Sequence, residues 1–139
     1  MSDAALRRLL ESNQKGVLVT LKRDGRPQLS NIIYAVADDV VRISVTDGRA
    51  KTKNLRRDPR ASLHVTSDDF WSYAVVEGDA ELSPVAADPA DDTVEELVAL
   101  YRAMRGEHPD WDDYRASMVR DRRLVVRVPV TRIYGMARD

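Results

Sequence analysis

Basic side chains are concentrated between residues 49 and 60, where Asp58 is the only acid. They are Arg49, Lys51, Lys53, Arg56, Arg57 and Arg60. Cationic side chains beside the unpaired N–H groups at the start of a helix favour binding of a phosphate group. A solvated basic helix face is the commoner meaning of such a charge run. The segment nevertheless predicts local recognition of an anion in a chain whose net charge is only −1.

Several other chemistries lack the residues they require. The chain has no cysteine, which excludes disulfides, thiolate nucleophiles and iron–sulfur clusters. His64 and His108 have no second histidine or cysteine at ligand spacing, so no metal site is expected. The Gly-rich dinucleotide, P-loop and α/β-hydrolase motifs are also missing from the sequence. No residue is therefore assigned to catalysis.

The overall charge and hydropathy exclude further classes of function. A slightly acidic chain with pI near 6.1 is not expected to bind nucleic acid or an anionic membrane. No apolar run approaches the roughly 20 residues that a membrane-spanning helix needs. The first residues also lack the basic and apolar segments of a secretory signal. We expect a cytoplasmic protein that acts on a small-molecule substrate.

The elements around the basic segment must position it. Residues 40–46 alternate apolar and polar side chains, which predicts a strand. Residues 49–57 predict a short helix that stops at Asp58-Pro59, because a residue before proline avoids the helical region. Residues 61–65 predict the strand that follows. The basic side chains are thus expected on a helix between two strands.

The rest of the chain predicts a barrel with helices around it. Six strands joined mostly by tight turns, with no helix among the first three, favour a mainly β (α+β), six-stranded antiparallel barrel formed by a single domain over residues 1–139. A capping box of Thr93 and Glu96 predicts one helix start, and Asp110 another. The expected strands are 17–21, 27–36, 40–46, 61–65, 71–82 with a bend at Gly78, and 124–135; the first helix is expected over 3–13, ended by Gly16.

Two groups of motifs carry a resemblance to a known family. The stretch from Val41 to Leu63, especially Asp-Pro-Arg-Ala-Ser leading into a strand, resembles the cofactor-phosphate segment of the pyridoxamine 5′-phosphate oxidase-like split-barrel family. A narrower similarity is to the actinobacterial flavin/deazaflavin oxidoreductases of the F420-binding B branch. It covers nearly the whole chain and rests on Gly25-Arg26-Pro27-Gln28-Leu29-Ser30-Asn31, Arg49-Ala50-Lys51-Thr52, Trp71-Ser72-Tyr73-Ala74 and Trp111-Asp112-Asp113-Tyr114-Arg115.

The resemblance implies a cofactor site that includes the basic segment. It implies that Arg49 and Lys51 hold the cofactor phosphate, assisted by Ser44, Thr46 and Thr52. The longer anionic tail of coenzyme F420 is an oligoglutamate that FMN lacks. The side chains available to it would be Lys53, Arg56 and Arg57. This feature favours F420 over FMN as the cofactor.

The same resemblance implies contacts to the cofactor ring and the substrate. Polar side chains on two neighbouring strands would hydrogen-bond the ring system or the ribityl chain; they are Thr20, Gln28, Ser30 and Asn31. Trp71 and Tyr73 are two residues apart, so they are expected on one face of a strand, bordering the ring or the substrate. Ordinary surface polarity and core aromatics remain the alternatives for these two groups.

The implied activity is that of an F420-dependent reductase, which transfers a hydride to a small electron-poor organic substrate. One alternative is an FMN-binding oxidoreductase on the same fold, and another is a non-catalytic F420 or flavin carrier. The C-terminal segment 132–139 lacks the arginine and histidine pattern of classical pyridoxamine phosphate oxidases, so pyridoxamine is not the expected substrate. The resemblance implies a homodimer with cofactor sites at the subunit interface. Pairing also buries open strand edges, which favours a dimer independently.

Overall fold

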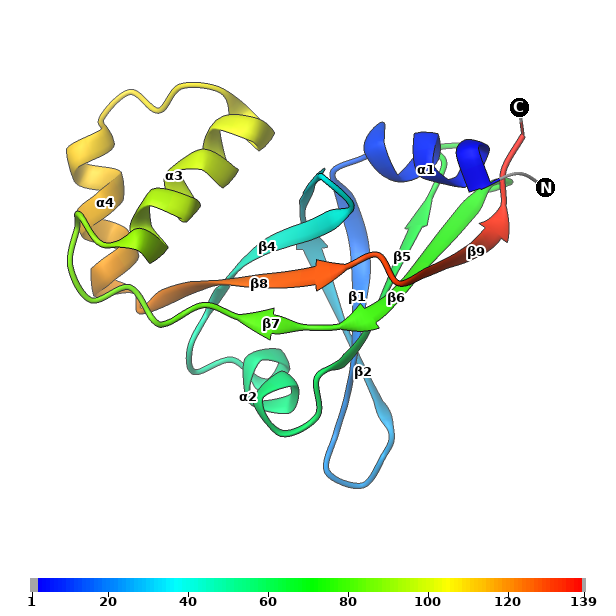
Figure 1. Ribbon diagram of the computed structural model, residues 1–139, viewed down its shortest axis with the longest axis horizontal. Helices are drawn as coiled ribbons and strands as arrows, with labels where there is room; N and C mark the ends of the chain where they lie inside the picture. The colour runs from blue at the N-terminus through cyan, green and yellow to red at the C-terminus, as the bar shows by residue number, and fades with distance from the viewer. Residues whose placement is uncertain (1–2, 139) are drawn as a thin grey trace.

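The computed structural model describes residues 3–138 as two antiparallel sheets with helices around them (Figure 1). The strands are β1 (Lys15–Leu21), β2 (Pro27–Ile33), β3 (Ala35–Ala37), β4 (Val40–Thr46), β5 (Arg60–Thr66), β6 (Tyr73–Asp79), β7 (Glu81–Leu82), β8 (Arg123–Pro129) and β9 (Arg132–Met136). The helices are α1 (Asp3–Glu11), α2 (Ala50–Arg57), α3 (Asp92–Arg105) and α4 (Trp111–Arg120). One sheet has the order β2-β1-β5-β6-β9, and the other has the order β3-β4-β8-β7.

Three of the predicted strands each contribute to both sheets. The expected strand 27–36 is divided into β2 and β3, 71–82 into β6 and β7, and 124–135 into β8 and β9. In each case the two halves lie in different sheets. The α+β barrel is confirmed, but its six predicted strands become nine within residues 3–138. A change of sheet leaves little trace in side-chain alternation, which is the signal that predicts strands.

The core lies between the two sheets. Alternate side chains of the strands point inward, and the most deeply buried include Leu18, Ile43, Leu63 and Val126. Tyr34 lies where the chain leaves β2 for β3, and its hydroxyl donates a hydrogen bond of 2.5 Å to the carbonyl oxygen of Leu10. Burial raises the pKa of Tyr34, so its hydroxyl stays a donor. This bond ties the end of α1 to the barrel.

Gly78 permits a close approach between β6 and β8. A Cβ atom at this position would lie 2.1 Å from the carbonyl oxygen of Pro129, the last residue of β8. The predicted bend at Gly78 is displaced, because β6 continues to Asp79 and the change of sheet comes at Ala80. Glycine is required here by the contact with β8 rather than by a bend.

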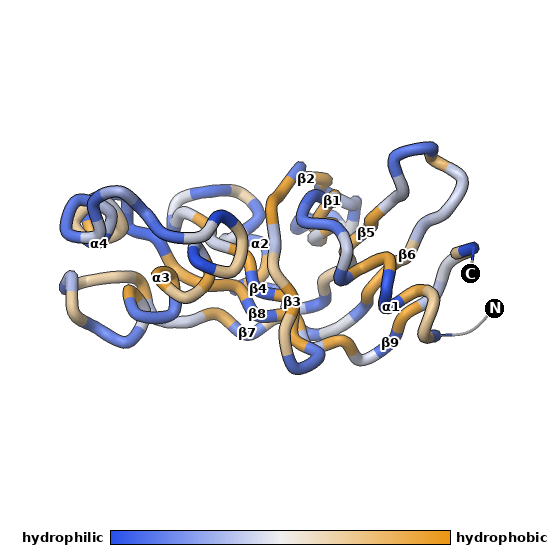
Figure 2. Tube along the Cα trace, turned by 90° about the horizontal axis from the view of Figure 1, so that it is seen from above, coloured by the Kyte–Doolittle hydropathy of each residue, from blue (hydrophilic) through white to orange (hydrophobic). Residues whose placement is uncertain are grey.

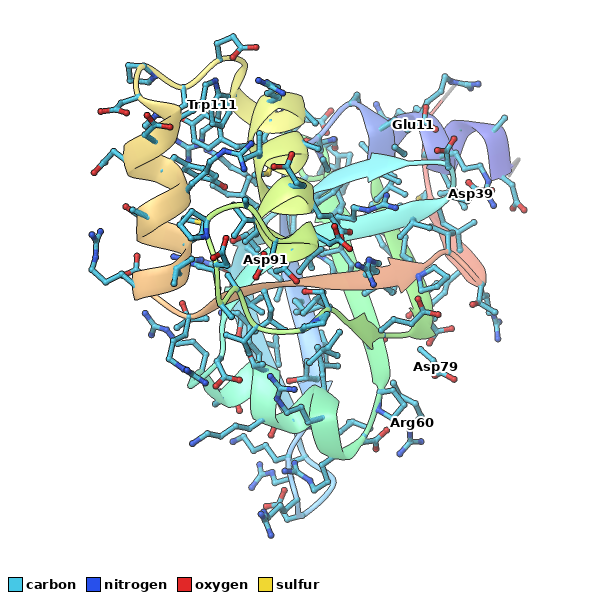
Figure 3. The ribbon with its side chains drawn as sticks, turned by 60° about the vertical axis from the view of Figure 1, so that its left-hand side comes forward. Glu11, Asp39, Arg60, Asp79, Asp91 and Trp111 are labelled. Carbon is cyan, nitrogen blue, oxygen red and sulfur yellow. The ribbon has the colours of Figure 1, made fainter. Side chains whose placement is uncertain are left out.

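Helices α3 and α4 pack as a pair on the four-stranded sheet (Figures 1 and 3). Their buried side chains meet Val125 of β8; they are Val94, Leu97, Val98 and Met118. The predicted capping box at Thr93 is wrong, because the N-cap is Asp91, whose carboxylate accepts a hydrogen bond of 2.9 Å from the N–H of Val94. Asp91 lies at the start of α3 in Figure 3.

The two capping-box residues have other partners. The Thr93 hydroxyl donates to the carbonyl oxygen of Pro84, and Glu96 accepts hydrogen bonds from Arg42 and Arg127. The second predicted start is confirmed, because Asp110 accepts from the N–H of Asp113. Aspartate and threonine both suit an N-cap, so tertiary contacts decide between adjacent candidates.

The first helix is shorter than predicted. α1 ends at Glu11 rather than Asn13, and Gly16 lies inside β1 opposite Ile32 instead of ending the helix. In Figure 2, where the trace is coloured by residue hydropathy, apolar residues recur along the strands, and polar residues are frequent at the turns and on the outer helices. In the described part of the chain no helix combines the length and apolar character needed to span a bilayer.

Candidate functional site

The helix α2 brings the basic segment to the end of strand β4. The helix begins after a turn over residues 46–49, and its Leu55 is buried in the core. The hydroxyl of Thr52 donates a hydrogen bond of 2.8 Å to the carbonyl oxygen of Thr46, which fixes the first turn of the helix to the strand. Arg49 is the N-cap residue and provides no side-chain cap. The predicted helix is confirmed, beginning one residue later than expected.

Asn54 anchors α2 to the hairpin of β1 and β2. Its side-chain nitrogen donates to the hydroxyl of Thr20 at 3.1 Å and to the side-chain oxygen of Gln28 at 3.0 Å. Its side-chain oxygen accepts a hydrogen bond of 3.0 Å from Arg57. Thr20 and Asn54 are both buried, so these polar groups satisfy one another inside the protein.

This contact gives Thr20 and Gln28 a role in positioning the basic helix. Sequence reasoning placed both residues near the cofactor ring and did not single out Asn54. The available signal was the position of Asn54 beside the apolar Leu55, on a helix whose other side is basic.

A group of basic side chains converges at the junction of β4 and α2. Lys51 is half-buried, and its pKa is lowered by burial first, then by the charges of Arg49 and Arg123. Ser44 and Thr46 alternate with buried residues of β4 and so face away from the core. A terminal nitrogen of Arg123 lies 3.4 Å from the hydroxyl of Ser44. Ser44, Thr46, Arg49 and Lys51 therefore lie at one junction together with Arg123, and their binding of a phosphate stays a prediction.

The three side chains predicted to hold an anionic tail have different surroundings. Arg56 donates to Asp47 at 2.5 Å, and hydrogen bonds from Arg122 and Arg56 lower the pKa of that carboxyl group. Arg57 donates to the carbonyl oxygen of Leu21 and to Asn54. Lys53 is exposed. Protein partners therefore occupy Arg56 and Arg57, whereas Lys53 faces solvent.

A basic groove of about 440 Å³ separates α2 from the β1–β2 turn. Its lining residues are Lys22, Arg23, Asp24, Ala50, Lys53, Asn54 and Arg57. Lys22 and Arg23 belong to the hairpin turn, more than twenty residues before the helix in the sequence. No local sequence pattern connects Lys22 and Arg23 with α2, because only the fold brings this turn beside the helix.

The remaining predicted residues lie on two faces of the five-stranded sheet. Ser30 is half-buried and points to the same side as Gln28, whereas Asn31 is exposed on the outer face, in a depression also lined by Val17 and His64. Tyr73 is on this outer face too, and its ring stacks on His64 with 5.7 Å between centroids. Gln28 and Ser30 therefore lie on one side of β2 and Asn31 on the other, although all three were predicted to contact the ring or the ribityl chain.

The prediction that Trp71 shares a strand face with Tyr73 is wrong. Strand β6 begins at Tyr73, and Trp71 lies in the preceding loop, where its backbone N–H donates to the carboxylate of Asp69. The loop turns at Phe70, which has a φ of 71°. Trp71 is 68% exposed and Phe70 79%, so the loop presents two aromatic side chains to solvent.

The outer face of the five-stranded sheet exposes several large apolar side chains. They come from both edge strands, β2 and β9, and from β6; they are Leu29, Ile33, Tyr73, Tyr134 and Met136. Leu29 is 63% exposed and Met136 55%. Exposed apolar side chains gathered on one face are typical of interaction surfaces.

Over residues 3–138, histidine, cysteine, aspartate and glutamate side chains form no group of three or more that would hold a metal ion. The site in this part of the chain thus consists of a basic junction, a basic groove and an apolar face.

Several solved structures have the same fold as this protein. A conserved hypothetical protein from Mycobacterium tuberculosis is 26% identical, with a TM-score of 0.77, over 99% of this chain and 85% of that chain. A protein described as an F420 reductase is 26% identical, with a TM-score of 0.72, over 92% of this chain and 94% of that chain. An FAD-binding protein from Mesorhizobium loti is 19% identical and shares the fold, with a TM-score of 0.70 over 97% of this chain and 92% of that chain.

A family comparison covers nearly the whole chain. Residues 2–137 match the family described as pyridoxamine 5′-phosphate oxidase. The match includes both sheets, the basic junction and the apolar outer face. This protein therefore belongs to the pyridoxamine 5′-phosphate oxidase family, whose split barrel it has.

Proposed function

We propose that this protein is an F420-dependent reductase, which transfers a hydride from the reduced deazaflavin to a small electron-poor organic substrate. The observation that carries the proposal is the pair of Arg49 and Lys51 at the start of α2, where a phosphate group would meet two cations and the uncapped end of a helix. The resemblance to a protein described as an F420 reductase, at 26% identity over most of both chains, supports the same assignment.

The residues present fit a phosphorylated cofactor. Lys51 is half-buried among like charges, which disfavours its ammonium form unless an anion is bound beside it. The hydroxyls of Ser44 and Thr46 face the same junction and can donate to phosphate oxygens. The chemistry of this donor set therefore matches a phosphate monoester or diester.

The basic groove supports F420 over FMN. An oligoglutamate tail extending from the junction would lie along α2 and meet Lys53 from the helix, with Lys22 and Arg23 from the hairpin turn. Charges of this kind on an open surface act together and are screened by salt. Only a cofactor with a polyanionic tail would use them.

The protein's contribution to the reaction is binding and orientation. When bound in its reduced form, coenzyme F420 supplies a hydride, and the protein need not provide a nucleophile. Arg49 and Lys51 hold one end of the cofactor, and the apolar outer face excludes water from the other. Asn31 and the stacked pair of Tyr73 and His64 border that face.

An FMN-binding oxidoreductase is the second candidate, and one observation favours it. Arg56 and Arg57 are already paired with Asp47, Leu21 and Asn54, so they need no anionic tail to be satisfied. FMN would use the basic junction alone.

We also propose that the protein is a homodimer whose cofactor sites lie at the subunit interface. The outer face supports this, because its exposed apolar side chains extend from Leu29 on β2 to Met136 on β9. Two charged residues of this face, Glu77 and Arg132, lie beside each other. A second copy offers an equally apolar, self-complementary face through twofold symmetry. The exposed aromatic loop at Phe70 and Trp71 lies next to the same face and would contribute to the partner's site.

Fluorescence titration of the purified protein with coenzyme F420 and with FMN tests the cofactor. We expect tighter binding of F420, and an increase in Kd of about tenfold or more for Lys51→Ala, because it removes a charge-assisted hydrogen bond. Lys53→Glu should weaken F420 more than FMN, whereas Arg105→Glu on α3 serves as the matched control and should leave both unchanged. Tight FMN binding with weak F420 binding would assign the second candidate instead.

A further inference from the structure

Arg123, the first residue of β8, has a buried and unsatisfied nitrogen. Within residues 3–138 its Nε is a buried side-chain nitrogen with no hydrogen-bond partner. One terminal nitrogen of the same guanidinium lies 3.4 Å from the hydroxyl of Ser44, which is a long and weak contact. An unpaired buried donor costs free energy, so its retention calls for a partner that binds there.

The surroundings of Arg123 are cationic. Arg123 is the cross-strand neighbour of Thr46, the residue that leads into α2, and its charge acts on Lys51 together with that of Arg49. Asp47, the acid nearest to Arg49 in the sequence, is bound by Arg56 and Arg122, and Asp121, two residues before Arg123, lies beside Arg120. Within residues 3–138, the three positive charges at this end of β4 and β8 therefore form no ion pair with these two carboxylates.

Two neighbouring elements, α4 and α2, place no anion beside Arg123 through Tyr114 or the helix start. The charge of Arg123 acts on Tyr114 of α4, but burial has the larger effect and raises the pKa of Tyr114 to about 12. The Tyr114 hydroxyl donates a hydrogen bond of 3.0 Å to the carbonyl oxygen of Leu97. Tyr114 therefore stays neutral at ordinary pH. The uncapped start of α2 adds N–H donors rather than acceptors to the same space.

We propose that Arg123 is a third ligand of the cofactor phosphate, which it binds through Nε and a terminal nitrogen opposite Lys51. This inference rests on the proposed function, since it assigns a residue to the same phosphate. A guanidinium that presents two parallel N–H groups matches the spacing of two phosphate oxygens. Arg123 is seventy-two positions after Lys51 in the sequence, and the pairing of β4 with β8 brings the two together.

FMN and riboflavin test the contact, because they differ only in the phosphate. We expect Arg123→Gln to raise the Kd for FMN by about tenfold or more and to leave the Kd for riboflavin unchanged. Arg122→Gln removes the same charge one residue earlier, from a side chain paired with Asp47, and should change neither Kd. Equal losses for the phosphorylated and dephosphorylated ligands would overturn the proposal.

Thermal unfolding without ligand separates a binding role from a structural one. Arg123→Met keeps most of the apolar stem, removes an unsatisfied donor and relieves repulsion from Lys51. We therefore expect a Tm equal to or above that of the wild type. A Tm lower by several degrees would identify Arg123 as a structural residue and contradict its assignment to the ligand.

Inorganic phosphate keeps the test independent of the cofactor. If the wild type bound neither F420 nor FMN, the proposed function would fail. Phosphate that raises the Tm of the wild type but not of Arg123→Met would still support the anion site. Equal protection of both proteins, or protection of neither, would overturn it.

Discussion

At the scale of single residues, the phosphate site that we propose depends on charges that the fold holds close together. Lys51 is half-buried and close to Arg49 and Arg123. Its burial and the charges of these two arginines all lower its pKa from the ordinary value of 10.5. A bound phosphate would reverse the balance, because the anion favours the ammonium form. The unliganded junction is therefore strained electrostatically in a way that ligand binding relieves.

Cofactor binding should depend on pH in the alkaline range through Lys51. Only the protonated amine attracts phosphate, and its lowered pKa means that the charge is lost at a lower pH than for an exposed lysine. The Kd for FMN or F420 should rise as pH increases through this range, and Lys51→Arg should remove much of the rise. Titrations at a series of pH values measure it.

Riboflavin provides the control for the pH series, since ring ionisation is common to both flavins while the phosphate is not. A Kd for riboflavin that rose as steeply as that for FMN would show that Lys51 is not the titrating group.

At the scale of elements, two polar contacts fix the helices on the barrel. Asn54 joins α2 to the β1–β2 hairpin through Thr20 and Gln28. Glu96 joins α3 to the four-stranded sheet through Arg42 of β4 and Arg127 of β8. Both contacts cross between elements far apart in the sequence, so each one sets the placement of a whole helix.

Replacing Asn54 should affect both stability and binding. Asn54→Ala leaves the buried hydroxyl of Thr20 and the amide of Gln28 without their donor, which should lower the free energy of unfolding by about 1–3 kcal/mol. Because α2 carries Arg49 and Lys51, the Kd for FMN should also rise. Urea unfolding and fluorescence titration measure the two effects. Asn13→Ala, at a partly buried residue whose side chain bonds only within its own segment, is the control.

The Glu96 contact should make stability sensitive to acid. Hydrogen bonds from Arg127, with a further contribution from Arg42, lower the pKa of Glu96 from its ordinary value of 4.5. A carboxyl group with a lowered pKa in the folded state stabilises that state above its unfolded pKa, and this stabilisation is lost as pH falls through the folded pKa.

Glu96→Gln tests whether stability is lost as pH falls through the pKa of Glu96. The substitution should lower the free energy of unfolding at pH 7 by about 1–3 kcal/mol, since it leaves Arg42 and Arg127 facing each other. It should also flatten the dependence of stability on pH below 4.5, the ordinary value for this group. Urea denaturation at neutral and acidic pH measures both; a wild-type slope retained by the variant would assign the acid sensitivity to other carboxylates.

At the scale of the whole molecule, the barrel presents one face that its own helices leave uncovered. Helices α3 and α4 pack on the four-stranded sheet (Figure 1). The outer side of the five-stranded sheet exposes large apolar side chains, among them Leu29 on β2 and Met136 on β9. The loop with Phe70 and Trp71 lies next to this face. A second copy of the chain is the partner that we propose for it.

Leu29→Glu should convert the homodimer into monomers, because it places a charge in an interface that would otherwise be apolar. Sedimentation equilibrium measures the mass in solution, and Ala116→Glu on the exposed side of α4 is the matched control. Monomeric wild type, or a dimer unaffected by Leu29→Glu, would contradict the proposed interface. Cofactor titration of the monomeric variant then reports whether the site needs the partner.

Much of this protein could be predicted from local sequence. Alternation of apolar residues located the strands, and the Asp58-Pro59 stop located the end of α2. The basic segment and its neighbours on β4, Ser44 and Thr46, were identified because they are close in the sequence as well as in space. Such features depend on periods of two or 3.6 residues and on backbone preferences, which a short window contains.

Only the tertiary structure decided which distant residues complete the site. Three strands change sheet because the barrel must close, and no local pattern records that change. Arg123, Lys22 and Asn54 reach the site through strand pairing and helix docking, and Trp71 leaves its predicted strand because the loop turns at Phe70. Contacts between residues far apart depend on the packing of whole elements, so the sequence determined the elements and the basic segment, while the fold determined their partners.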